Sequence, residues 1–204
     1  MDIRNQPLLP GNIYHLFNCG VGYEKIFRTN ENYLFFVEKI SKYILPVCDI
    51  LAYCLLPDHF HLMIKVKPEQ ELTTFAKTIK KEKINLPAII SEQFSNCFNS
   101  YTKSYNKVFK RHGKLFDLPF KRIEVSSDIY YTVLIAYIHR NPVHHGYVKD
   151  FTDWKFSSYN AFLSDKPTKI SRNEILDWFG NTNEFIKFHL GSLEQFNDRD
   201  LFLE

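Results

Sequence analysis

The chain has 204 residues, 45% of them hydrophobic, which is enough for one domain with a hydrophobic core and some additional structure. Its net charge is only +3. It contains no apolar run long enough to span a bilayer and no signal-peptide pattern at its N-terminus, so we expect a soluble, cytoplasmic protein. The four cysteines lack Cys-x-x-Cys spacing, which argues against a zinc knuckle or a disulfide framework and favours reduced thiols.

The first two thirds of the chain predict alternating strands and helices. Strands are expected over residues 12–18, 47–55, 59–66 and 115–125, with Pro119 implying an edge or a bulge in the last of them. Helices are expected over residues 31–44, 72–83 and 89–109. This order predicts an α+β, ferredoxin-like (RRM-like) fold, with helices on one face of an antiparallel sheet.

The third predicted strand carries two histidines. Side chains alternate along a strand, so His59 and His61 share one face while Phe60 points to the other. Neutral imidazoles bind divalent metals, so the pair forms half of a metal site, although two histidines that only form hydrogen bonds would give the same pattern. Asp58 either supports a ligand histidine or is a turn residue, and His15 either lines the site or is a core histidine.

In the segment from residue 101 to residue 122, basic residues are interspersed with aromatic residues. Basic side chains contact phosphates and aromatic rings stack on unpaired bases, but a solvated helix face with its aromatic residues in the core explains the pattern equally well. The candidate DNA-contacting residues are Lys103, Lys107, Lys110, Arg111, Lys114, Lys121 and Arg122, and the interleaved rings are Tyr101, Tyr105, Phe109, Phe116 and Phe120.

A further helix is expected after Ser126, Ser127 and Asp128, which offer N-cap chemistry, and we expect it to end at Asn141 because Pro142 follows. Tyr137 and Asn141 are four residues apart and therefore lie on one face, where a phenol and an amide oxygen could complete a metal-phosphate site. A core tyrosine and an ordinary helix end are the alternative.

Other residues of this region leave several interpretations open. Tyr130 is a core residue or a second nucleophile. His139 packs or touches DNA, and His144 and His145 contact phosphate or are merely exposed.

The character of the chain changes after about residue 162. A loop at residues 164–168 is followed by predicted helices that start near Ser171 and Thr182 and end at Phe179 and His189. We expect residues 163–204 to form a small helical extension, mobile from Asn197 onward.

Several of these segments together resemble the HUH single-tyrosine transposases, in the branch that includes the REP-associated tyrosine transposases. The resemblance covers about residues 10 to 162. It rests on Pro-Asp-His-Phe-His at residues 57–61 and Tyr-Ile-His-Arg-Asn-Pro-Val-His-His-Gly at residues 137–146, supported by Tyr14–Asn18, Gly113–Phe116 and Asp153–Tyr159.

The resemblance implies that residues 1–162 form a catalytic domain that cleaves and rejoins single-stranded DNA, with hairpin-forming DNA as the expected substrate. It further implies that His59, His61 and Asn141 hold Mg²⁺ or Mn²⁺ and that Tyr137 attacks the scissile phosphate, which leaves a 5′-phosphotyrosine link and a free 3′-OH. Relatives of this kind are monomers or homodimers, and both states stay open for this chain.

Two other functions are compatible with the same residues. A nucleic-acid-binding module could keep the fold without catalysis. A metallohydrolase could use His59 and His61, but the sequence offers it no obvious acidic third ligand.

Overall fold

The computed structural model describes residues 4–117 and 119–191. Its four strands are β1 (Ile13–Cys19), β2 (Cys48–Leu55), β3 (His59–Val66) and β4 (Lys121–Val125). Its α-helices are α1 (Asn30–Lys39), α2 (Glu69–Thr78), α3 (Leu86–Val108), α4 (Asp128–His144), α5 (Tyr159–Phe162), α6 (Arg172–Phe179) and α7 (Thr182–Leu190). Short 3₁₀ turns η1 (Val21–Tyr23) and η3 (Phe151–Asp153) and a π-helical segment η2 (Ile40–Ile44), which continues α1, complete the described elements.

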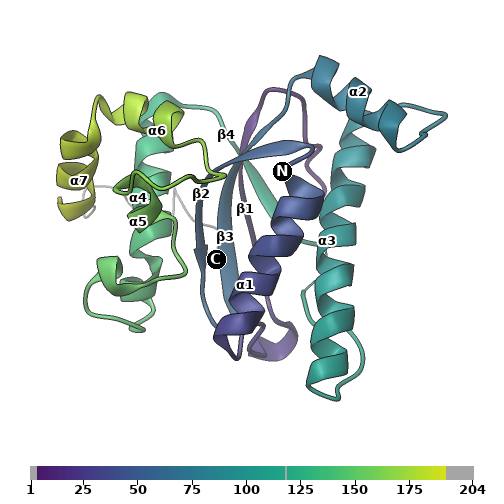
Figure 1. Cartoon of the computed structure of the whole chain (residues 1–204), viewed down its shortest axis with the longest axis horizontal. Helices are drawn as coiled ribbons and strands as arrows, with labels where there is room; N and C mark the ends of the chain where they lie inside the picture. Colours follow the sequence, from purple (N-terminus) through teal and green to yellow (C-terminus); the bar gives the residue numbers. More distant parts are fainter. Residues whose placement is uncertain (1–3, 118, 192–204) are drawn as a thin grey trace.

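The strands form one antiparallel sheet in the order β2-β3-β1-β4 (Figure 1). With helices connecting β1 to β2 and β3 to β4, this order is that of a ferredoxin-like sheet, and the predicted α+β fold class is confirmed. β1 and β3 are central, so a side chain on either strand has neighbours on both sides.

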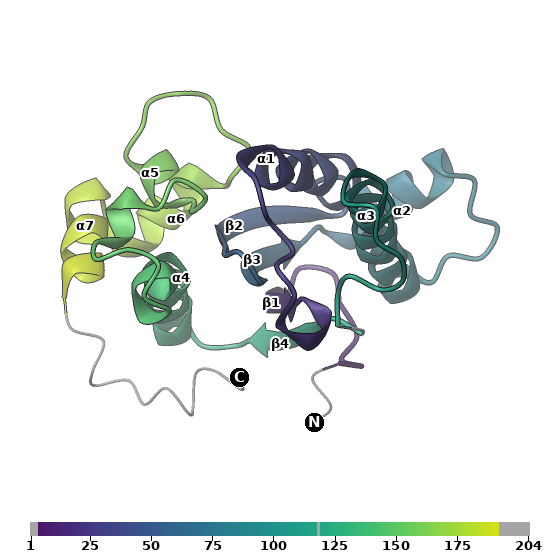
Figure 2. The same cartoon turned by 90° about the horizontal axis from the view of Figure 1, so that it is seen from below.

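Helices cover both faces of the sheet: the helices of the ferredoxin-like unit lie on one face, as expected, and the later helices cover the other. Figure 2 shows α1 and α3 on one side and α4 to α7 on the other. On the first side, Phe36 and Phe98 pack against Phe60 in one core cluster. On the second side, Leu134 and Ile138 of α4 lie in a cluster that includes Met63. β3 places Phe60, Leu62, Ile64 and Val66 on the first side and Met63 beside the histidines on the second, so both of its faces gain from being covered.

The helix α4 passes through Pro142 and ends at His144, so the predicted end at Asn141 was wrong. A proline removes one backbone donor from a helix, and in the last turn this costs a single hydrogen bond. The turn is still closed, because the His145 amide donates to the Asn141 carbonyl at 3.0 Å and the Tyr147 amide donates to the Pro142 carbonyl at 2.9 Å.

The last strand begins at Lys121 rather than at residue 115. Pro119 lies within the predicted span and has no amide hydrogen for the ladder, and upstream of it only an isolated bridge pairs Phe116 with Gly20 among the described residues. The predicted helix over residues 72–83 is shifted to Glu69–Thr78.

The C-terminal helices pack on the same core as α4. Ile175 of α6 and Phe185 of α7 are fully buried in the cluster that holds Leu134 and Ile138. The segment before α6 also reaches the sheet, where Ile170 forms a parallel bridge with Ile50 of β2. A boundary at residue 162 stays a prediction, and the residues from Asn197 onward lie outside those described.

Cys19, Cys48, Cys54 and Cys97 are free thiols, and all but Cys19 are buried. Across residues 4–117 and 119–191, none of the helices has the length and apolar character needed to cross a membrane.

Two buried histidines join α4 to α7. His139 and His189 are fully buried, and the His189 Nδ1 lies 2.8 Å from the Phe185 carbonyl oxygen, to which it donates. The His139 Nδ1 lies 2.8 Å from the His189 Nε2, and the His139 Nε2 lies 2.7 Å from the Ser158 hydroxyl. With both rings neutral, His139 donates to His189 and accepts from Ser158, so each ring nitrogen of this network has a partner. Of the two interpretations open for His139, the structure supports packing.

Acid should destabilise the fold through this pair. Burial lowers the pKa of His189 to about 4 and lowers that of His139 well below its ordinary value. The unfolded chain therefore takes up protons first as the pH falls from about 6.5 to about 4, and stability is lost across that window. Denaturant titrations should show His189 alone reducing the free energy of unfolding by about 2 kcal/mol between pH 7.5 and pH 5.

The variant His189→Leu isolates this contribution from that of the carboxylates. Its free energy of unfolding should depend less steeply on pH than that of the wild type. An identical pH dependence in the two proteins would contradict the prediction.

Candidate active site

The two histidines of β3 lie on the face of the sheet that α4 covers. β1 runs beside β3, with Cys19 opposite His59 and Phe17 opposite His61. The rings of His59 and His61 are edge to face with 5.3 Å between their centres, while Phe60 is buried in the core on the opposite side. The period-2 pattern of the strand therefore places both imidazoles where a single group could contact them.

Tyr137 and Asn141 approach these histidines from α4. The ring of Tyr137 lies edge-on to that of His61 with 5.7 Å between centres, and the Asn141 Oδ1 lies 3.3 Å from the His59 Nε2. Tyr137 is 5% exposed and Asn141 fully buried. The structure thus brings together the four residues that the sequence singled out, from two elements some 75 residues apart along the chain.

Asp58 orients His59. Its Oδ1 lies 2.8 Å from the His59 Nδ1 and also accepts a hydrogen bond from the Tyr147 hydroxyl at 3.2 Å. Burial opposes ionisation of Asp58, but the hydrogen bonds and charge of its neighbours outweigh it, and its pKa is lowered. Burial and the Asp58 charge raise the pKa of Tyr147 to about 12, so the phenol stays a donor. A carboxylate that accepts from Nδ1 leaves Nε2 as the nitrogen for coordination.

His15 holds the second histidine in a comparable way. Its Nε2 lies 3.0 Å from the His61 Nδ1, and the two rings stack at 5.2 Å between centres. The His15 ring is also edge-on to Tyr137 at 6.5 Å. His15 is buried and contacts both His61 and Tyr137, so it lies against the candidate site, and its role there stays a prediction.

The residues present suit a divalent ion. The His59 Nε2 and the Asn141 Oδ1 converge at 3.3 Å, and the buried Asn141 Nδ2 has no hydrogen-bond partner among the described residues. The His61 Nδ1 contacts His15, so the nitrogen that His61 would offer to a metal is its Nε2. Within the described part of the chain no three His, Cys, Asp or Glu side chains form a metal-binding group, so the third protein ligand of such a site would be the amide of Asn141.

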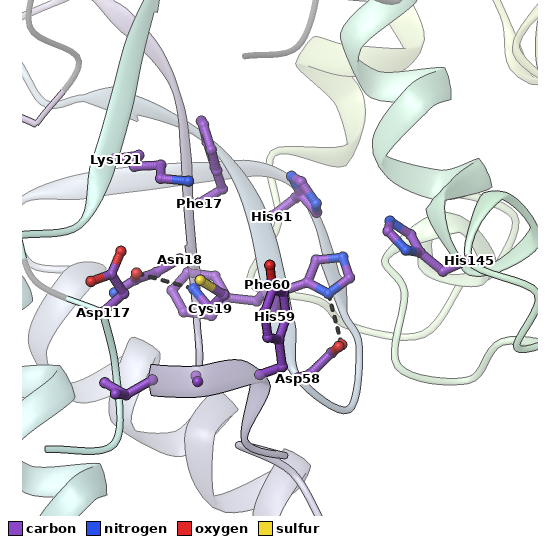
Figure 3. A pocket seen from close by; sticks show the side chains of 14 residues that line it. Phe17, Asn18, Cys19, Asp58, His59, Phe60, His61, Asp117, Lys121 and His145 are labelled. Atoms are coloured by element: carbon purple, nitrogen blue, oxygen red, sulfur yellow. Dashed lines mark hydrogen bonds and ion pairs between the residues drawn. The ribbon is translucent and has the colours of Figure 1, made fainter. Parts of the chain in front are cut away.

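His144, the last residue of α4, and His145, the residue that follows it, lie beside the site. The ring of His145 lies 4.5 Å from that of His59, and Figure 3 shows it extending from α4 toward the sheet. The ring of His144 lies 5.8 Å from that of Tyr137. Tyr147, which contacts Asp58, was not predicted from the sequence. It lies in the loop after α4, and no sequence pattern indicates that this loop folds back onto the β2–β3 turn.

The basic cluster separates into exposed and structural residues. Lys103, Lys107, Lys110 and Lys114 are exposed. Arg111 instead pairs with Glu24, and Arg122 is 8% exposed, with a hydrogen bond of 3.1 Å to the Arg4 carbonyl. Lys121 is half-buried at the edge of the site. Four of the five interleaved rings are buried and Phe109 packs against the same core, so they are not stacking surfaces.

Tyr130 and Tyr131 are partly buried on α4. Burial raises the pKa of Tyr130, and Tyr131 stacks on Trp178 of α6 at 5.1 Å. The contacts of these two residues are those of packing, whereas Tyr137 faces the histidines.

Comparison with known proteins agrees with this geometry. The family model described as "Transposase IS200 like" matches residues 13–141, which include all four central residues. A Haemophilus influenzae protein named as a candidate REP-associated tyrosine transposase is 28% identical over 141 residues, which are 68% of this chain and 71% of that protein. A solved structure of a REP-associated tyrosine transposase bound to a REP hairpin superposes with a TM-score of 0.58 and 18% identity, covering 84% of this chain and 92% of that one. The chain belongs to the IS200-like transposase family.

Proposed function

We propose that the protein binds single-stranded, hairpin-forming DNA and cleaves and rejoins it through a covalent link to Tyr137. Membership of a transposase family supports DNA cleavage. The observation that carries the chemistry is the convergence of Tyr137 with His59, His61 and Asn141 at one point of the sheet. DNA as the partner is further supported by the structural relative, which is bound to a REP hairpin.

In the proposed reaction, the Tyr137 oxygen attacks the phosphorus in line with the bond to the 3′ oxygen. A tyrosine–phosphorus bond forms, the bond to the 3′ oxygen breaks, the phenol gives up its proton, and the departing oxygen takes one to become a free 3′-OH. One phosphoester bond replaces another, so the reverse reaction can rejoin the strand. Tyr137 is 5% exposed, so the attack requires the residues around it to move when DNA binds.

His59, His61 and Asn141 would hold Mg²⁺ or Mn²⁺ in this site. When bound, the ion would polarise a non-bridging oxygen of the scissile phosphate. Asp58 and His15 would keep the two imidazoles oriented through their Nδ1 atoms. Two imidazoles and an amide add no negative charge, so substrate and water oxygens would complete the coordination that Mg²⁺ prefers.

The test is incubation with hairpin DNA labelled at its 3′ end, in the presence of Mn²⁺, followed by denaturing electrophoresis. The proposal expects a labelled protein–DNA band, since the 5′ phosphate of the downstream fragment is joined to the protein. Hairpin binding without an adduct would favour the catalytically silent module. Cleavage without an adduct would favour metal-dependent hydrolysis.

The exposed lysines of α3 are proposed to contact DNA phosphates. Lys103 and Lys107 lie four residues apart on one helix face, and neither takes part in the ion pairs found within residues 4–117 and 119–191. When both are replaced by alanine, the association constant for DNA should depend less steeply on salt. The magnitude of the slope of log K against log salt should fall by about 0.9 for each phosphate that the variant no longer neutralises.

The matched control removes the same charge elsewhere. Lys166→Ala with Lys169→Ala alters the exposed loop before α6. Fluorescence anisotropy at several salt concentrations should show a smaller slope for the α3 variant alone. Equal slopes in both double variants would place the phosphate contacts on another surface.

A further inference from the structure

A pocket of about 460 Å³ lies directly beside the two histidines of β3. Its walls come from the end of β1, the turn η1, the start of β3 and the start of β4, as Figure 3 shows. His59 and His61 form one wall, and Phe17, Lys121 and Tyr23 also line it. The volume is within the range that small ligands occupy, which is sufficient for a nucleobase.

Tyr23 is presented to solvent in a conformation that tyrosine rarely adopts. It is 89% exposed, the largest exposed fraction among the large hydrophobic residues that the structure describes. Its φ is +60°, directly after Gly22 at +63°. A bulky residue in the left-handed region is strained, and such strain is kept where the surrounding structure fixes the backbone.

The backbone around Tyr23 is fixed on both sides. The Gly20 amide donates to the Asp58 carbonyl at 2.8 Å, and the Val21 amide donates to the Leu115 carbonyl at 3.0 Å. After the turn, the Tyr101 hydroxyl donates to the Ile26 carbonyl at 2.6 Å. A Cβ on Gly20 would lie 2.0 Å from the Glu24 carbonyl oxygen, so the turn closes too tightly for any side chain there. The Tyr23 ring is therefore exposed on an anchored turn.

The charges around the pocket suit a nucleotide. The Lys121 ammonium lies 5.3 Å from the centre of the Phe17 ring, and none of the ion pairs between described residues uses it. The two carboxylates that line the pocket are both engaged: Asp58 with His59 at 2.8 Å and Asp117 with Arg4 at 2.9 Å. A phosphate near Lys121 would meet a cation, with Asp117 paired to Arg4 and Asp58 held by hydrogen bonds from His59 and Tyr147.

We propose that this pocket receives an unpaired nucleotide next to the scissile phosphate, with Tyr23 stacked on its base and Lys121 near its phosphate. The inference rests on the proposed function, which places the scissile phosphate at His59 and His61. A tyrosine ring stacks on any base, so this contact would secure the single-stranded part of the substrate without reading its sequence. Tyr23 would thereby position the strand without taking part in the chemistry.

The test uses Tyr23→Asn, because asparagine tolerates the left-handed backbone and lacks the ring. Its affinity is measured for a DNA hairpin with a short thymidine extension, placed on the 5′ side or the 3′ side, and for the same hairpin without one. The variant should bind at least one extended hairpin about 5- to 150-fold more weakly than the wild type does, and bind the bare hairpin equally well. Tyr23→Phe keeps the ring and should bind like the wild type.

Two controls make the result specific. Leu34→Asn changes another exposed apolar residue, on α1, and should not alter either affinity. Removing the bases of the extension while keeping its phosphates should abolish the difference between wild type and Tyr23→Asn. An unchanged affinity of Tyr23→Asn for both extended hairpins, or an equal loss for the extended and bare hairpins, would overturn the inference.

The two proposals fail separately. A wild-type protein that forms no adduct but binds extended hairpins through Tyr23 would refute the covalent chemistry and keep the stacking contact. A wild-type protein that forms the adduct while Tyr23→Asn binds every hairpin normally would keep the chemistry and refute the contact.

Discussion

Replacing Tyr137 by phenylalanine should abolish the covalent protein–DNA adduct and leave hairpin affinity within about twofold of the wild type. The change removes the hydroxyl that would form the phosphoester and keeps the ring, which lies edge-on to His61 and His15. The loss should be at least about a thousandfold, because no other group supplies the nucleophile. Denaturing electrophoresis measures the adduct, and fluorescence anisotropy measures binding.

Tyr130→Phe is the matched control for this variant. Tyr130 lies on the same helix two turns earlier and is partly buried. Its hydroxyl should not affect the adduct yield. If Tyr130→Phe loses the adduct and Tyr137→Phe retains it, the nucleophile has been assigned to the wrong tyrosine.

Replacing His59 by alanine should weaken Mn²⁺ binding to the free protein and remove Mn²⁺-dependent cleavage. The His59 Nε2 approaches the Asn141 Oδ1 at 3.3 Å, so the change would remove one of the proposed ligands. Loss of a partner such as Asp58 typically reduces metal affinity by about 10- to 100-fold, and loss of a ligand should cost at least as much. Electron paramagnetic resonance of added Mn²⁺ reports binding without any need for catalysis.

His112→Ala provides the comparison, because His112 is exposed in the loop after α3. Its Mn²⁺ affinity should equal that of the wild type. Asp58→Asn should fall between the two variants, since Asp58 orients His59 through Nδ1. Equal Mn²⁺ affinities for His59→Ala and His112→Ala would show that His59 is not a ligand.

Local periodicity predicted the two halves of the candidate site, and the resemblance to the transposases was needed to join them. The alternation of β3 predicted that His59 and His61 share a face, and the helical repeat predicted the same for Tyr137 and Asn141. The contacts that support these residues depend on tertiary structure. Tyr147 reaches Asp58 at 3.2 Å only because the chain turns back after α4, and no repeat marks such a turn.

The basic cluster shows where composition misleads. Arg111 and Arg122 have the same charge as the exposed lysines around them, but Glu24 and the Arg4 carbonyl, both distant in sequence, hold them. Met63 lies on the same face of β3 as His61, and an apolar residue there needs a covering element. That element is α4, which is why the catalytic candidates lie in a buried position.

The most direct test of the proposed chemistry is to locate the nucleotide in the adduct by mass spectrometry. Trypsin should release residues 123–140 as one peptide, which contains Tyr130, Tyr131 and Tyr137. After nuclease trimming of the adduct, fragmentation of this peptide should place the added nucleotide mass on Tyr137. A nucleotide on Tyr130, on Tyr131 or on a residue outside this peptide would contradict the proposed mechanism.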